Sequence, residues 1–158
     1  MRYFIDTNIF LFMCGDTDEL GWETKELLLD CENSFIISSE SIREIAMLAK
    51  GGKIHFKGLR VFDDVKKILD AHNIEIRYVA EAHLKTLFNL NPAPRHSDPA
   101  DLVIISQAIA EKLPLISSDT QFPNYSQQGL KAIFNQRPTT RPGRRPLRKN
   151  AGLSNTGA

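Results

Sequence analysis

The sequence predicts an α/β protein in which helices flank a central parallel β-sheet. Two observations support this: short, continuous apolar runs end in polar residues, and segments with helical periodicity alternate with these runs. Runs of this kind are typical of strands that are buried on both faces of a parallel sheet. At 158 residues, 42 % of them apolar, the chain is long enough for one sizeable core and too short for two.

Three of the apolar runs are bulky, and polar residues follow each of them. They are residues 3–5 (YFI), followed by Asp6, residues 35–37 (FII), followed by Ser38, and residues 114–116 (PLI), followed by Ser117, Ser118 and Asp119. A fourth strand is expected at 74–78, where apolar and polar residues alternate, and a short helix near 80–87.

Three further segments have the apolar spacing of helices. The first spans residues 42–49, after a candidate cap at Ser41, and stops at Gly51-Gly52. The second spans 62–69 and ends near Asn73. The third begins at Asp98, an N-cap residue followed by proline at the first helical position, and its apolar face runs over residues 102–109.

Charge divides the chain into an acidic body and a basic tail. Residues 136–158 contain six cations and no acid, so residues 1–135 hold 14 Lys and Arg against 19 Asp and Glu, although the whole chain has a net charge of +1. We therefore predict a folded domain over 1–135 and a disordered basic tail over 136–158. An acidic body is unusual for a nucleic-acid binder, unless its carboxylates gather to hold cations.

Four acids from distant places in the sequence are expected to meet at one edge of the sheet. Asp6 and Asp119 follow two of the predicted strands, and Glu44 and Asp101 are expected in the first turns of two helices. In open α/β sheets, ligands bind outside the carboxyl ends of the strands. Clustered carboxylates repel one another unless a cation neutralises them. Mg²⁺ or Mn²⁺ would do so, and a water bound to such an ion can attack a phosphodiester.

Each acid also has a purely structural interpretation. Glu44 stands three residues after Ser41, which is capping-box spacing, so its side chain could bond to the Ser41 backbone N–H. Asp101 could offset a helix dipole, and Asp98 could be a plain N-cap. Asp6 is harder to explain in this way, because a carboxylate directly after a buried strand is costly to desolvate without a partner.

Other chemistry has little support in the sequence. The four histidines show no HxxxH spacing, and Cys14 and Cys31 form no CxxC pair, so neither a zinc site nor a disulfide framework is expected. No run approaches the ~20 apolar residues of a membrane span, and the N-terminus reaches Asp6 too soon for a signal peptide. We therefore expect a cytoplasmic protein.

Four sequence blocks, in order, resemble the PIN-domain proteins, and in particular the VapC-like toxins of bacterial toxin–antitoxin pairs. They are FIDTN at 4–8, SSESIREI at 38–45, HSDPADLVIISQA at 96–108 and LPLISSD at 113–119. The resemblance implies a Rossmann-like parallel sheet flanked by helices and a Mg²⁺- or Mn²⁺-dependent endoribonuclease. It also implies a cognate antitoxin as partner and, often, a homodimer.

The resemblance also assigns roles to residues. The family's four acids fall on Asp6, Glu44, Asp101 and Asp119. The first, third and fourth of these are the expected metal ligands. The secondary candidates are Asp98, an added acid near the site, and the polar residues Ser117, Thr7 and Asn8. Leu102 and Ser97 stand where many relatives have basic residues, so substrate contacts from these two positions are in doubt.

Three alternatives remain at this point. One is an RNA-processing PIN nuclease that has no antitoxin. Another is a phosphatase of the haloacid-dehalogenase type, whose chemistry wants a second Asp where this chain has Asn8. The last is a non-enzymatic, metal-binding regulator resembling a response regulator, which would need a phospho-accepting Asp where Ser38 stands. The basic tail lies outside the resemblance and could bind RNA, contact a partner or do neither.

Overall fold

The computed structural model describes residues 1–54 and 58–139. Its centre is a five-stranded, fully parallel sheet in the order β3-β2-β1-β4-β5. The strands are β1 (Arg2–Ile5), β2 (Ser34–Ser38), β3 (Ile74–Arg77), β4 (Leu115–Ser117) and β5 (Ala132–Phe134). The predicted α/β class with a parallel central sheet is therefore confirmed, and all four predicted strands are present.

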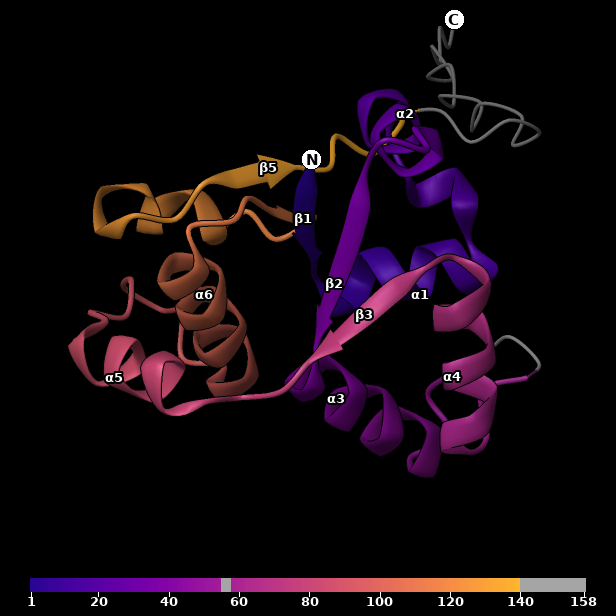
Figure 1. The fold of residues 1–158 in the computed structure, drawn as a ribbon, viewed down its shortest axis with the longest axis horizontal. Coiled ribbons are helices and arrows are strands. Elements are labelled where there is room, and N and C mark those ends of the chain that lie inside the picture. Colours follow the sequence, from indigo (N-terminus) through magenta and orange to yellow (C-terminus); the bar gives the residue numbers. More distant parts are fainter. Residues whose placement is uncertain (55–57, 140–158) are drawn as a thin grey trace, which may run out of the picture.

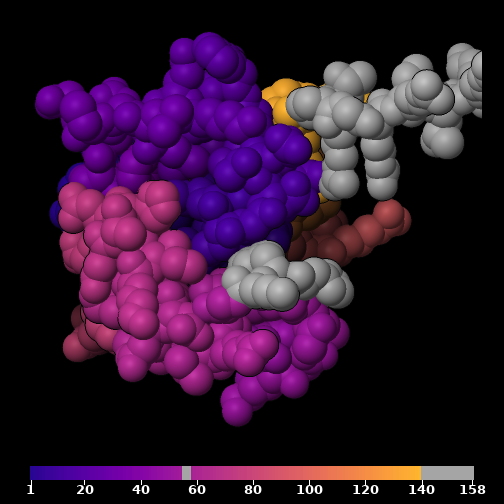
Figure 2. Space-filling model, turned by 90° about the vertical axis from the view of Figure 1, so that its right-hand side faces the viewer, coloured from indigo at the N-terminus to yellow at the C-terminus, as the bar shows by residue number. Residues whose placement is uncertain are grey.

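Helices cover both faces of this sheet. They are α1 (Thr7–Gly15), α2 (Trp22–Leu29), α3 (Ser39–Lys50), α4 (Phe62–Ala71), α5 (Glu81–Asn89) and α6 (Pro99–Glu111), with short 3₁₀ helices η1 (Thr17–Glu19) and η2 (Phe122–Gln128). In Figure 1, α5 and α6 lie on one side of the sheet and α1 and α4 on the other. Figure 2 looks onto the latter side, whose surface is formed mainly by α1, α2 and α4.

Alternate residues of the strands supply two separate cores. Ile5, Ile37 and Ile116 pack with residues of α1, α3 and α4 on one face. Phe4, Ile36 and Leu115 pack with residues of α6 and η2 on the other. Because strand residues alternate between faces, a run such as Tyr3-Phe4-Ile5 must be apolar throughout when both faces are covered. This explains why the central strands read as continuous apolar runs.

The helix ends differ from expectation at one place that matters. Helix α6 begins as predicted, with Asp98 as N-cap and Pro99 as its first residue. Helix α3, however, begins at Ser39, because the Ser38 hydroxyl accepts the Glu40 backbone N–H and acts as N-cap in place of Ser41. Glu44 therefore lies in the second turn of α3, and the expectation that it lies in the first turn is wrong.

Helices α1 and α2 and strand β5 were not predicted from the sequence. The segment IFLFM in α1 is apolar on every side, so it shows no helical periodicity, and β5 has only three residues.

Most of the predicted tail, residues 140–158, lies outside the described residues. Within the described part of this tail, the Arg137 guanidinium lies 4.9 Å from the centre of the Phe12 ring and 3.5 Å from the Glu19 carboxylate. No helix within the described ranges is long and apolar enough to cross a membrane.

Candidate functional site

The strand order places two of the predicted acids at the point where the topology reverses. Strands β1 and β4 are neighbours, and the chain continues outward from them to β2 and β3 in one direction and to β5 in the other. Asp6 follows the last residue of β1, and Asp119 comes two residues after the end of β4. Crevices at such switch points are the usual ligand sites of open α/β sheets.

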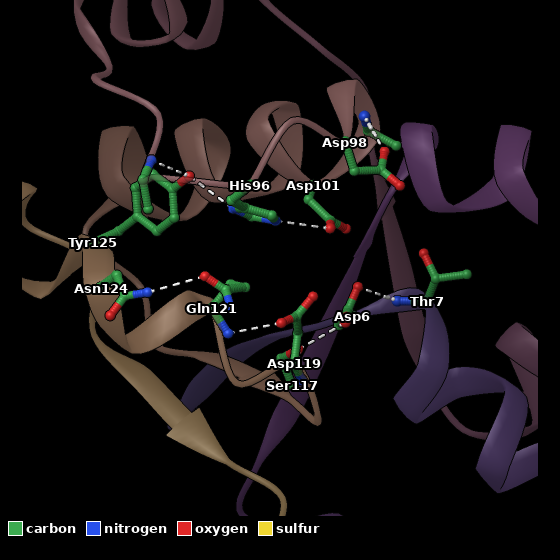
Figure 3. Close-up of polar contacts among 12 residues, drawn as sticks. Asp6, Thr7, His96, Asp98, Asp101, Ser117, Asp119, Gln121, Asn124 and Tyr125 are labelled. Carbon is green, nitrogen blue, oxygen red and sulfur yellow. Dashed lines mark hydrogen bonds and ion pairs between the residues drawn. The ribbon is translucent and has the colours of Figure 1, made fainter.

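Ser117 links these two acids. Its hydroxyl donates to Asp6 Oδ2 at 2.8 Å and accepts the Asp119 backbone N–H at 3.0 Å. The Thr7 backbone N–H donates to the other oxygen of Asp6 at 2.7 Å, so both carboxylate oxygens are held. Asp6 is only 3 % exposed. Figure 3 shows the carboxylates of Asp6 and Asp119 pointing toward the space below Asp101.

Asp98 and Asp101 reach the site from the N-terminus of α6. Asp98 is the N-cap, as its structural interpretation predicted, and its side chain accepts the Ala100 N–H at 2.9 Å. Asp101 lies in the first turn, as expected. One oxygen of Asp101, Oδ2, lies 3.0 Å from His96 Nε2. Gln121 contributes a further contact, since its backbone N–H donates to Asp119 Oδ1 at 2.7 Å.

Glu44 does not form a capping box. Its Oε1 accepts the hydroxyl of Thr7 at 2.6 Å, a contact between α3 and the start of α1. The Ser41 side chain, which the capping interpretation needed as N-cap, is fully buried and has no hydrogen-bond partner within the described residues. The structural interpretation of Glu44 as a capping residue is therefore wrong, because α3 begins two residues before Ser41.

The electrostatics show that these carboxylates share one environment. Burial raises the pKa of Asp6 from 3.8 to about 7, the Ser117 hydrogen bond opposes this rise, and the charges of Asp101 and Glu44 add to it. Burial also raises the pKa of Asp101 and of Glu44, and nearby acids, including Asp98 for both, raise them further. Such a cluster is strongly favourable for a cation, which would remove the repulsion.

The structure thus brings Asp6, Glu44, Asp101 and Asp119 into one cluster, with Asp98, Ser117 and Thr7 in contact or close by. Asn8 differs, because it is exposed on α1 and has no hydrogen bond to this cluster among the described residues. Carboxylate oxygens are the ligands that Mg²⁺ and Mn²⁺ prefer. Three atoms lie within 4.8 Å of one another: a ring nitrogen of His96, a carboxylate oxygen of Asp101 and a carboxylate oxygen of Asp119. This spacing suits a single ion.

Sequence reasoning missed His96. It stands five residues before Asp101 and is 6 % exposed, with Asp101 on one side and Tyr125 on the other. Zinc-type spacing does not point to His96, because its partners are a carboxylate and a phenol. Its only sequence signal was its place at the start of the block 96–108 that carries Asp98 and Asp101.

The fold and the site define a class: parallel α/β domains whose carboxylates gather where the strand order of the sheet reverses. The comparisons with known proteins define the family within this class. Residues 3–127 match the PIN domain family, so this chain belongs to that family. PIN domains are generally nucleases and typically use a divalent metal ion. No curated protein matches the sequence significantly.

Solved structures share the fold. VapBC2 from Rickettsia felis, bound to a DNA fragment from its promoter, is similar with a TM-score of 0.60 and 20 % identity over 85 % of this chain and 98 % of that chain. VapBC-1 from nontypeable Haemophilus influenzae is similar with a TM-score of 0.59 and 17 % identity, again over 85 % of this chain and 98 % of that chain. A domain of a functionally unknown protein from Methanocaldococcus jannaschii is similar with a TM-score of 0.53 and 25 % identity, over 85 % of this chain and 91 % of that chain.

Proposed function

We propose that this protein is a Mg²⁺- or Mn²⁺-dependent endoribonuclease that hydrolyses RNA phosphodiester bonds at Asp6, Glu44, Asp101 and Asp119. The observation that carries the proposal is the burial of Asp6 among other acids, with its pKa raised to about 7. A buried, repelled carboxylate is costly unless a ligand compensates its charge. Membership of the PIN family supports nuclease chemistry, and it argues against the phosphatase and regulator alternatives.

The proposed roles follow from the contacts. Asp6, Asp101 and Asp119 would hold the ion, and Ser117 would keep Asp6 and Asp119 in place through its two hydrogen bonds. Glu44, held by Thr7, would complete the cluster and orient the attacking water. A bound divalent cation supplies charge for the developing negative phosphate oxygens and lowers the pKa of a water. Because water attacks and not the ribose 2′-OH, the products would carry a 5′-phosphate and a 3′-hydroxyl.

We also propose that the protein is the toxin of a toxin–antitoxin pair, acting in the cytoplasm with a cognate antitoxin and as a homodimer. The similarity of the fold to two VapBC structures favours this role. An RNA-processing nuclease without an antitoxin is the alternative. The presence of a small antitoxin-like reading frame beside the gene, and relief of growth arrest when both are expressed, would distinguish the two.

Chelation tests the metal requirement. We expect EDTA to abolish RNA cleavage and Mn²⁺ or Mg²⁺ to restore it, without any need for Zn²⁺, because the cluster offers hard oxygen ligands. The measurement is cleavage of total RNA, with the new ends sequenced to establish whether they carry a 5′-phosphate. Full activity in EDTA, or ends with a 2′,3′-cyclic phosphate, would contradict the mechanism.

Glu44→Gln separates charge from shape. The Gln oxygen can still accept the Thr7 hydroxyl, so the melting temperature should change little. Cleavage at saturating Mn²⁺ should fall by about 10²-fold, because the group that orients the attacking water loses its charge. Glu81→Gln, an exposed acid on α5, is the matched control and should cleave like the parent. Unchanged cleavage by the Glu44 variant would show that its charge plays no part.

A further inference from the structure

His96 lies between the phenol of Tyr125 and the carboxylate of Asp101. Its Nδ1 is 2.7 Å from the Tyr125 hydroxyl, and its Nε2 is 3.0 Å from Asp101 Oδ2 (Figure 3). The ring also packs against Phe122 and Tyr125, with centroid distances of 5.9 and 5.5 Å. Because His96 is 6 % exposed and Tyr125 fully buried, these partners determine which ring nitrogen carries the proton.

A backbone group decides the direction of this hydrogen-bond chain. The Ala93 N–H donates to the Tyr125 hydroxyl at 3.0 Å, so that oxygen is already an acceptor. Its own proton then has His96 Nδ1 as its acceptor within the described part of the chain. With Nδ1 accepting, a neutral His96 carries its proton on Nε2 and donates it to Asp101 Oδ2.

The other possible role of His96 is that of a metal ligand, since its ring nitrogen and the oxygens of Asp101 and Asp119 lie close enough to share an ion. A ligating Nε2 needs its lone pair, so the proton would have to sit on Nδ1. The Tyr125 oxygen would then accept from both Ala93 and His96. Its own proton would be left without an acceptor among the described residues, in a fully buried side chain, which is an unfavourable arrangement.

We infer that His96 is a positioning residue, locked by Tyr125 and Ala93, that donates its Nε2–H to Asp101 and is not itself a metal ligand. This hydrogen bond occupies Asp101 Oδ2, so the other oxygen, Oδ1, would be the one that binds the cation. The use of Asp101 as a ligand rests on the proposed function, whereas the position of the proton on His96 does not.

The first test is the ¹⁵N NMR spectrum of the imidazoles in the full-length protein, recorded in EDTA and with saturating Mg²⁺. His83 provides an internal reference, because its Nδ1 accepts the Ala80 N–H at 2.9 Å and its Nε2 lies 3.0 Å from Glu111. We expect His96, like His83, to be protonated on Nε2 in both conditions. A proton on Nδ1, or loss of the Nε2 proton when Mg²⁺ is added, would overturn the inference.

The second test compares Mn²⁺ affinities by calorimetric titration. Tyr125→Phe and His96→Ala should each weaken binding by roughly 10–100-fold, the usual effect of losing a group that orients a ligand. His96→Gln can still donate to Asp101 and should recover most of the affinity. His83→Gln, a buried histidine outside the cluster, is the control and should bind like the parent. Equal affinity of the parent and the Ala variant, or no recovery with Gln, would contradict the positioning role.

These measurements separate the inference from the proposed function. A protein that shows the expected proton position and affinities but cleaves no RNA would refute the nuclease proposal alone. A protein that cleaves RNA while His96 is protonated on Nδ1 would refute the positioning role alone.

Discussion

Asp6→Asn is expected to lower RNA cleavage by at least about 10³-fold, equivalent to about 4 kcal/mol of transition-state stabilisation. The substitution removes the charge of the most buried carboxylate in the cluster and preserves its size. The Asn carbonyl can still accept the Thr7 N–H, and its amide can donate to the Ser117 hydroxyl, which also accepts the Asp119 N–H. The Ser117 proton then loses Asp6 as its acceptor, a cost that removal of the buried, repelled charge offsets. The loss should therefore appear in activity and Mn²⁺ affinity and not in folding.

The same variant should be at least as stable as the parent in EDTA at neutral or higher pH, because it no longer buries a repelled charge. Cleavage, Mn²⁺ titration and urea denaturation are the measurements. Asp63→Asn, an exposed acid in the first turn of α4, is the matched control and should cleave normally. Residual activity within about tenfold of the parent (about 1.4 kcal/mol) would mean that Asp6 is not an essential ligand.

The second large effect is a loss of stability as pH rises in the absence of metal. The pKa of Asp6 is raised from 3.8 to about 7 by burial, so between these values the folded state binds the proton that the unfolded state has lost. Stability from this group is fully present below pH ~4, falls as pH rises toward 7 and is absent above it. At about 1.4 kcal/mol per pH unit, the loss between pH 5 and pH 8 is roughly 3 kcal/mol.

Urea denaturation of the parent and of Asp6→Asn across this pH range isolates the contribution of Asp6, because the other titrating groups are largely common to both. The free energy of unfolding of the parent should fall relative to the variant as pH rises. Burial also raises the pKa of Glu44 and Asp101, so they act in the same direction. Saturating Mn²⁺ should suppress the loss, because it binds the folded state. Parallel curves in EDTA would contradict the burial argument.

The cluster itself depended on contacts that no local pattern contains. The sequence placed Asp6 and Asp119 after strands and Asp101 in a helix turn, and the family resemblance assembled the four acids. The sequence left two interpretations of Glu44 open, because the spacing of a capping box also occurs where no capping box forms. Only the folded chain decided between them, since Glu44 bonds to Thr7, 37 residues away.

The sequence by itself determined the fold class, four of the strands, the cap of α6 and the family, because these depend on local periodicity, capping chemistry and ordered motifs. The tertiary structure decided which acids share charge, that Ser117 joins two of them across 111 residues of chain, and that His96 reaches Asp101. The physical reason is that pKa shifts and hydrogen-bond direction depend on burial and on partners brought together by packing. A local sequence pattern contains information about neither burial nor the partners that packing brings together.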